Sequence, residues 1–216
     1  MWVKVCGLRT VANTLEVAES GVDAIGLNFY EKSKRSITAE AAKEIVDALP
    51  KNVMSIGLFV NHPVDEVLQI AEETGIKTLQ FHGDETPEFV AQFKDFQIIK
   101  AFRIDANNIG DLQAQIDSYQ SAGIELFGCL IDANVSDAYG GTGKTAPWEV
   151  LRQNYDYDNF PPLILAGGLT AENVQEAVNI VQPWGVDTAS GVESAPGIKD
   201  ACLSQKFIQQ AKSRLE

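Results

Sequence analysis

One pattern constrains the fold of this chain more than any other: a short β-rich run, a turn and a helix-period segment, repeated from end to end. The strand candidates are residues 2–6, 23–29, 53–60, 77–82, 97–103, 124–132, 163–168 and 185–190. Helical patterns between them include 11–19, 39–48, 64–74, 108–121, 171–181 and 197–213. Strands that alternate with helices predict βαβ units and a parallel sheet.

The number of units predicts how this sheet is closed. Dividing 216 residues among eight units gives 27 residues each, close to the minimum for a strand, two loops and a helix. No linker or change in composition marks a second domain. We therefore expect residues 1–216 to form a single (β/α)8 TIM barrel, eight parallel strands with outer helices. An open doubly wound sheet is the weaker alternative, since it typically has about five or six strands.

Composition limits the partners. A net charge of −13 repels phosphate backbones and argues against nucleic acid. No apolar run is long enough for a membrane span, and nothing resembles a signal peptide, so we expect a cytoplasmic protein. Three scattered cysteines fit a reducing compartment, and two histidines without a CxxC motif make a metal site improbable.

Side-chain alternation predicts an unusually polar barrel interior. In the sixth strand it turns Phe127, Cys129 and Ile131 toward the helices and leaves Asp132 inside. The predicted inward polar residues are Lys4, Cys6, Asn28, Gln80, His82, Lys100, Asp132 and Asp187. Such groups are costly to bury unless they pair or take part in chemistry. Several lie near the carboxyl ends of strands, where active sites of this fold are found.

Three late loops are rich in glycine: AYGGTGKTAPW (138–148), AGGLTAENV (166–174) and SGVESAPGIKD (190–200). Glycine lets the backbone approach a ligand closely, and the loops after the last barrel strands commonly bind phosphate. We therefore predict a phosphate site; the alternative is that these loops are merely tight turns. The residues assigned to it are Gly141, Gly143, Gly167, Gly168, Ser190 and Gly191.

Three side chains are candidates for the chemistry. Cys6 shares a strand face with Lys4, whose charge favours a thiolate base, although most free cysteines are simply small buried residues. Asp132 is either a salt-bridge partner or, if desolvated at the barrel mouth, a proton donor. Arg35 is either a solvated surface charge or a fork for a substrate carboxylate. His82 fits a hydrogen-bonded interior residue better than a catalyst.

The motifs VKVCGLRT, LQFHGDE, LID, GGTGKT, LAGGL and SGVE…PGIKD, in this order and spacing, resemble phosphoribosylanthranilate isomerases. The resemblance implies an Amadori rearrangement of a phosphoribosylated anthranilate in tryptophan biosynthesis, without a cofactor or metal. It implies Cys6 as general base, Asp132 as general acid and Arg35 as the carboxylate ligand. His82 and Asp187 are expected to contact the substrate. A monomer or homodimer is expected.

The chain departs from the family pattern at three places. Lys34 stands between Ser33 and Arg35 where the family usually has proline, so that loop loses a rigid turn. Residues 146–148 read Ala-Pro-Trp where Phe-Asp-Trp is usual, and Thr188 and Ala189 replace the common Val and Ser. None of these changes removes a proposed catalytic group.

Two other functions remain open at this stage. One is another phosphate-binding barrel enzyme, such as indole-glycerol-phosphate synthase or the tryptophan synthase α subunit; the cysteine ending the first strand argues against both. The other is a catalytically silent phosphosugar-binding barrel, which the Cys6 and Asp132 pair disfavours.

Overall fold

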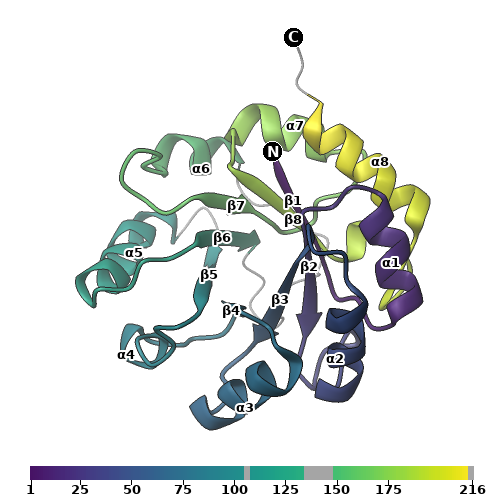
Figure 1. Ribbon diagram of the computed structural model, residues 1–216. Coiled ribbons are helices and arrows are strands. Elements are labelled where there is room, and N and C mark those ends of the chain that lie inside the picture. Colours follow the sequence, from purple (N-terminus) through teal and green to yellow (C-terminus); the bar gives the residue numbers. More distant parts are fainter. Residues whose placement is uncertain (105–107, 134–147, 214–216) are drawn as a thin grey trace.

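The computed structural model describes residues 1–104, 108–133 and 148–213, in which eight parallel strands form a closed barrel (Figure 1). The strands are β1 (Trp2–Cys6), β2 (Ala24–Asn28), β3 (Met54–Phe59), β4 (Thr78–Phe81), β5 (Gln97–Ile104), β6 (Gly128–Ala133), β7 (Leu163–Leu165) and β8 (Gly185–Thr188). Each strand pairs with its sequence neighbour, and β8 returns to pair with β1. The predicted (β/α)8 barrel is confirmed.

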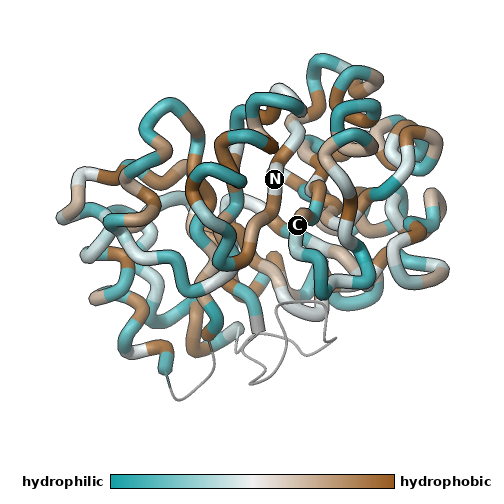
Figure 2. Tube along the Cα trace, turned by 90° about the horizontal axis from the view of Figure 1, so that it is seen from below, coloured by the Kyte–Doolittle hydropathy of each residue, from teal (hydrophilic) through white to brown (hydrophobic). Residues whose placement is uncertain are grey.

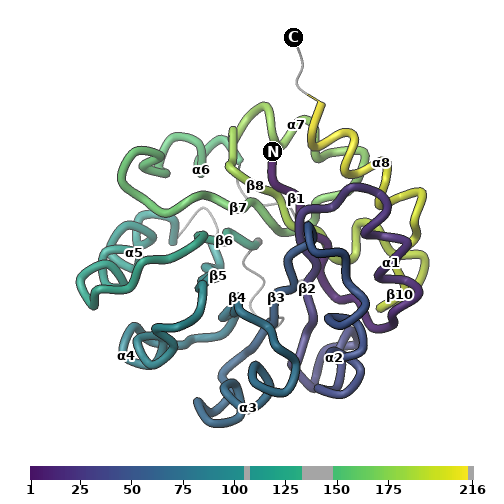
Figure 3. Tube along the Cα trace, viewed as in Figure 1, coloured from purple at the N-terminus to yellow at the C-terminus, as the bar shows by residue number. Residues whose placement is uncertain are grey.

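Helices surround the barrel, and the chain follows the ring until α8 lies beside α1 (Figure 3). They are α1 (Val11–Glu19), α2 (Ala39–Ala48), α3 (Val64–Thr74), α4 (Pro87–Val90), α5 (Leu112–Ser121), α6 (Trp148–Asn154), α7 (Val174–Val181) and α8 (Ala201–Lys212), with 3-10 turns η1 (Ile109–Asp111) and η2 (Ser190–Val192). Side-chain caps fix several helix starts, because Thr10, Thr38, Thr86 and Asp200 each accept a backbone N–H bond. None of the described helices is long and apolar enough to cross a membrane.

The apolar core has two layers. The larger layer lies between strands and helices, and in a side view hydrophobic segments run through the middle of the molecule (Figure 2). The smaller layer fills the barrel with Ala24, Ile56, Ile99, Ala101, Leu130, Ile164 and Ala166. It packs on Trp2, Met54 and Phe127, at or next to the amino ends of strands. Apolar packing therefore fills the barrel toward the amino ends of the strands and leaves the carboxyl ends for polar groups.

Two predicted side-chain directions are wrong. Ile99 and Ala101 fill the barrel, so Lys100 between them faces the helix layer, where Nζ lies 3.2 Å from Glu85 Oε2. The apolar run on both sides of Lys100 hid this alternation. Phe127 does not face the helices either: it precedes β6 and packs edge-on against Trp2 and Trp184.

The last predicted helix begins later than the pattern suggested. Residues 193–195 form β9 (Glu193–Ala195), which pairs antiparallel with β10 (Ile198–Lys199) before α8 starts at Ala201. Gly197, with φ +81°, makes the turn between them. The hairpin is tied to α1, since Asn13 exchanges two hydrogen bonds with the backbone of Lys199, at 2.7 and 2.8 Å.

Candidate active site

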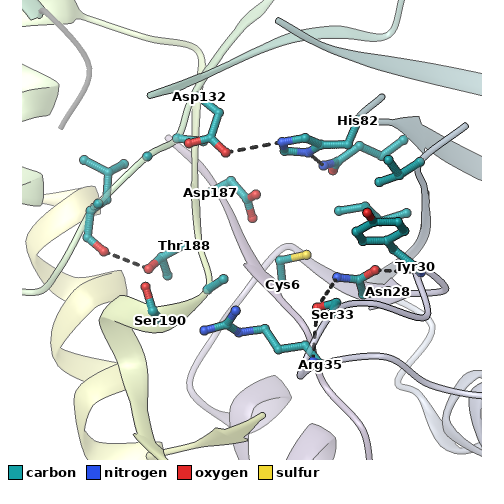
Figure 4. A pocket seen from close by; sticks show the side chains of 18 residues that line it. Cys6, Asn28, Tyr30, Ser33, Arg35, His82, Asp132, Asp187, Thr188 and Ser190 are labelled. Atoms are coloured by element: carbon teal, nitrogen blue, oxygen red, sulfur yellow. Dashed lines mark hydrogen bonds and ion pairs between the residues drawn. The ribbon is translucent and has the colours of Figure 1, made fainter. Parts of the chain in front are cut away.

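A cavity that is partly open to solvent lies at the carboxyl ends of the strands. Figure 4 shows how side chains from β1, β2, β6 and β8, and His82 directly after β4, converge on it. Of the predicted site residues, it is lined by Cys6, Arg35, His82, Asp132, Gly167, Gly168, Asp187 and Ser190. Gly191 follows Ser190 in η2. Gly141 and Gly143, also assigned to phosphate, lie outside the described residues.

A buried ion pair between Lys4 and Asp187 adjoins the cavity, which Asp187 lines. Lys4 and Asp187 are register partners on β1 and β8, and Lys4 Nζ donates to Asp187 Oδ1 at 2.9 Å. The Lys4 side chain is completely buried. Burial opposes its charge, but Asp187 and Cys6 outweigh this and raise the pKa of Lys4. Burial also raises the pKa of Asp187, against the opposing effect of Lys4. The pair fixes a cation close enough to interact with the Cys6 thiol.

Cys6 ends β1 beside this pair, and its register partner on β2 is Gly26. A Cβ on Gly26 would lie 2.6 Å from Sγ, so this glycine leaves the space that the thiol occupies. Burial raises the pKa of the Cys6 thiol, whereas Lys4 and Lys199 lower it. The predicted effect of Lys4 on the thiol is therefore present, but burial outweighs it.

Asp132 and His82 lie next to each other in the lining of the pocket, with 3.3 Å between Oδ2 and Nε2 (Figure 4). Both side chains are buried. The Gln80 amide nitrogen lies 3.0 Å from His82 Nδ1. Which ring nitrogen carries the hydrogen depends on the tautomer, and neither Gln80 Oε1 nor His82 Nε2 has a hydrogen-bond partner among the described residues. Gln80, His82 and Asp132 form a polar row.

Arg35 is not the solvated loop charge that was one of its two interpretations. Its guanidinium makes two 2.7 Å bonds to Glu193 and points toward Ser190 beneath Cys6 (Figure 4). Ser33 Oγ, which accepts from the Arg35 amide at 3.1 Å, holds the loop without the family's proline. Gly7, at φ +86°, is also required here, because its Cβ would lie 2.6 Å from Arg35 Cδ. The neighbouring Lys34 is exposed and does not line the cavity.

The loops after β7 and β8 pack together where phosphate was predicted. Gly167 and Gly168 have φ values of +87° and +68°, which other residues rarely adopt. A Cβ on Gly191 would overlap the Leu169 carbonyl, so the two loops can approach this closely only with glycine there. The Thr188 hydroxyl donates to the same carbonyl at 2.8 Å. These contacts bring glycine backbone to the edge of the cavity.

Sequence reasoning overlooked Glu193, which binds the Arg35 guanidinium, and Lys199, whose charge acts on Cys6. Both fall in the SGVESAPGIKD segment, whose glycines predict a phosphate site but say nothing of these two charges. Two opposite charges in a loop next to a barrel strand were the available signal. Among the described residues, no group of three His, Cys, Asp or Glu side chains could hold a metal ion.

A closed barrel of eight parallel strands, with a thiol, a carboxylate and an arginine around one cavity at their carboxyl ends, defines the class: a (β/α)8-barrel enzyme. Residues 3–210 match the family model described as N-(5'-phosphoribosyl)anthranilate (PRA) isomerase. The chain belongs to this isomerase family, as its motifs predicted.

Individual relatives agree with the family model. The N-(5'-phosphoribosyl)anthranilate isomerase of Geotalea uraniireducens is 43% identical, over 97% of this chain and 98% of the relative. That of Trichlorobacter lovleyi is 40% identical, over 99% and 98%. The crystal structure of phosphoribosyl anthranilate isomerase from Thermotoga maritima superimposes with a TM-score of 0.87 at 35% identity, covering 98% of both chains.

Proposed function

We propose that this protein converts N-(5-phosphoribosyl)anthranilate into 1-(2-carboxyphenylamino)-1-deoxy-D-ribulose 5-phosphate, an Amadori rearrangement of L-tryptophan biosynthesis. It would act as an aldose–ketose isomerase, an intramolecular oxidoreductase that needs no cofactor. The observation that carries the proposal is the placement of Cys6 and Asp132 on one cavity, in a chain of the PRA isomerase family.

Both ends of this substrate are anionic, and each has a candidate partner. Backbone around Gly167, Gly168, Ser190 and Gly191 would bind the phosphate. Arg35 would bind the anthranilate carboxylate with the N–H groups that Glu193 does not occupy. Asp187 and His82 would contact the ribose between these ends, because both line the same cavity.

Asp132 would act as the general acid that opens the ribose ring. Its proton goes to the ring oxygen while the bond from that oxygen to C1 breaks, and the aniline nitrogen lone pair forms a C1=N iminium. His82 Nε2 lies 3.3 Å from Oδ2. With its ring hydrogen on Nε2, His82 would hold this carboxyl oxygen and leave the other for the substrate.

Cys6 would act as the general base in the next step. The iminium acidifies the C2 proton; its removal by the thiolate sends the C2–H electron pair into a C1=C2 bond and neutralises the nitrogen. Proton transfer to C1 and loss of the enol proton then give the ketone. Burial raises the pKa of Cys6, so the thiolate depends on nearby cations, which are Lys4, Lys199 and, when it forms, the iminium.

A turnover assay tests the activity directly. We expect the purified protein to consume N-(5-phosphoribosyl)anthranilate without added metal or cofactor and to release no CO₂. We also expect its gene to rescue a tryptophan auxotroph that lacks this isomerase. Binding of a product analogue without turnover would instead establish a silent phosphosugar-binding protein, and CO₂ release would indicate a synthase that closes the indole ring.

We further infer a cytoplasmic, single-domain protein that works as a monomer or homodimer on a small anionic substrate and not on nucleic acid. The net charge of −13 supports the choice of partner. Light scattering on the purified chain would measure its oligomeric state, and a nucleic-acid gel-shift assay should remain negative.

A further inference from the structure

Glu193 is the centre of a buried charge cluster next to the candidate active site. Oε1 accepts from Arg35 Nε and Lys199 Nζ, each at 2.7 Å, and from the Gly197 amide at 3.0 Å. Oε2 accepts from Arg35 Nη2 at 2.7 Å. The side chain of Glu193 is only 6% exposed. Two cations and one amide thus hold a single carboxylate in a fixed orientation, and its pKa lies below the usual range despite burial.

Lys199 connects this cluster to Ala189, the residue before Ser190 of the predicted phosphate site. Its side chain is completely buried, and Nζ donates to the Ala189 carbonyl at 2.9 Å as well as to Glu193. Burial lowers the pKa of Lys199, and contact with Glu193 favours its charged form. Glu193 is therefore the counter-ion that allows this buried ammonium to stay charged.

We propose that Glu193 is a positioning residue: it holds the Arg35 guanidinium in the one orientation that recognises the substrate carboxylate, and Lys199 fixes Glu193 in turn. This inference rests on the proposed role of Arg35. A guanidinium has five N–H donors in a rigid plane, and Glu193 occupies two of them on one edge. The plane is thereby set before the substrate arrives, and the remaining N–H groups belong to a side chain that lines the cavity.

The fixed orientation should matter for specificity more than for binding in general. A long arginine side chain that is free to rotate must be ordered by the ligand, which weakens every contact it makes. Only the carboxylate uses this contact, so loss of Glu193 should weaken carboxylate-bearing ligands selectively. A purely structural residue would instead weaken all ligands of the cavity to a similar extent.

Two ligands separate these cases. One is reduced 1-(o-carboxyphenylamino)-1-deoxyribulose 5-phosphate, the compound bound in a crystal structure of a related phosphoribosyl anthranilate isomerase (TM-score 0.84, 33% identity over 98% of both chains). The other is the same molecule with a plain phenylamino group. The Kd of the phenylamino compound divided by the Kd of the carboxyphenylamino compound measures carboxylate recognition, because both carry the same phosphate and sugar.

Calorimetry should compare the wild type with Glu193→Gln and Arg35→Ala. Glu172→Gln is the matched control, since Glu172 also pairs with a lysine, Lys206, but on the exposed surface. We expect the ratio to fall about tenfold in Glu193→Gln, as when one charge-assisted hydrogen bond loses its geometry. It should fall at least as far in Arg35→Ala and stay unchanged in Glu172→Gln.

A buried lysine without its counter-ion could prevent folding of Glu193→Gln, so the double variant Glu193→Gln/Lys199→Met should be measured beside it. The double variant leaves no buried lysine without a counter-ion, since of the two cations only the partly exposed Arg35 remains, and it should show the same loss of ratio. If the ratio stays at its wild-type value in whichever Glu193 variant folds while Arg35→Ala loses it, Glu193 is structural only and this inference is overturned. If Arg35→Ala also keeps the ratio, the proposed role of Arg35 fails, and the inference with it.

Discussion

Removing the Lys4 ammonium should destabilise the barrel strongly, because it leaves Asp187 without its ion-pair partner. Lys4 is fully buried and Asp187 nearly so, and the pair is joined at 2.9 Å. Breaking such a pair from one side costs roughly 3–5 kcal/mol, most of it from the uncompensated charge that remains. We therefore expect Lys4→Met to lose about this much of its free energy of unfolding at neutral pH. Adding Asp187→Asn should recover part of that loss.

The destabilisation should depend on pH in a defined direction. Burial already raises the pKa of Asp187 above its ordinary value, although Lys4 opposes the effect. Without Lys4 the folded-state pKa rises further, so the folded variant binds a proton that the unfolded chain has released. A group whose pKa is raised in the folded state stabilises the fold at pH values below its unfolded-state pKa, which is near 3.8 for Asp187. This stabilisation is lost as the pH rises through the folded-state pKa. Lys4→Met should thus lose less stability at acid pH than at pH 8.

Urea denaturation of both variants and the wild type between pH 5 and 8 measures these differences. Activity adds an independent observation: Lys4 lowers the pKa of the Cys6 thiol, so its loss should move the alkaline rise of kcat/KM to higher pH. If Lys4→Met lost less than about 1 kcal/mol of its free energy of unfolding, or lost the same amount at both pH values, Asp187 would not be a buried charge that depends on Lys4. Strictly additive effects in the double variant would refute the coupling between the two residues.

The remaining predictions concern the substrate groups. Cys6→Ser and Asp132→Asn should each lower kcat by about 10² to 10⁴-fold while the Kd of a product analogue changes little, and near-normal kcat in either variant removes that residue from the mechanism. In the wild type, kcat/KM should rise with pH through the raised pKa of Cys6. Inorganic phosphate should inhibit competitively, and a crystal grown in it should show the anion beside Ser190; an anion seen only elsewhere would contradict the assignment. Arg35→Ala should reduce kcat/KM by roughly ten- to a few hundredfold and, because Arg35 is paired and half-buried, lower stability by about 1–3 kcal/mol. Lys34→Ala should keep full kcat/KM, and the reverse result would assign the carboxylate contact to Lys34.

The fold could be predicted because its signals are local and repeated. Each unit carries its own apolar period and often its own cap, as Thr10 and Thr38 show. Alternation failed at Phe127, which precedes β6, and at Lys100, where the pattern was ambiguous. Apolar residues flank Lys100 on both sides, and the Glu85 carboxylate that satisfies it lies 15 residues away in the chain. No local pattern reports such a contact.

The cavity was predicted in part for a related reason. Strand ends of a parallel barrel meet at one rim, so Cys6, His82 and Asp132 could be expected together from sequence. The partner of Arg35 could not. Glu193 is 158 residues away, and its hairpin folds back onto the barrel through a turn whose geometry no spacing rule specifies. Sequence therefore indicated which groups face the cavity, but not which groups hold them.

The acidic character of the chain makes the local cations at this site more informative. With 30 acidic against 17 basic residues, the surface as a whole repels a substrate that carries a phosphate and a carboxylate. Around Cys6 the balance differs, since Lys4, Lys199 and Arg35 offset Asp187 and Glu193. Each of these cations is tied to a carboxylate that keeps it charged when buried, and only Arg35 has a rigid fork with N–H groups left over for a ligand. Lys4 and Lys199 therefore act on the thiol through their charge, and anion recognition falls to Arg35 and the glycine backbone.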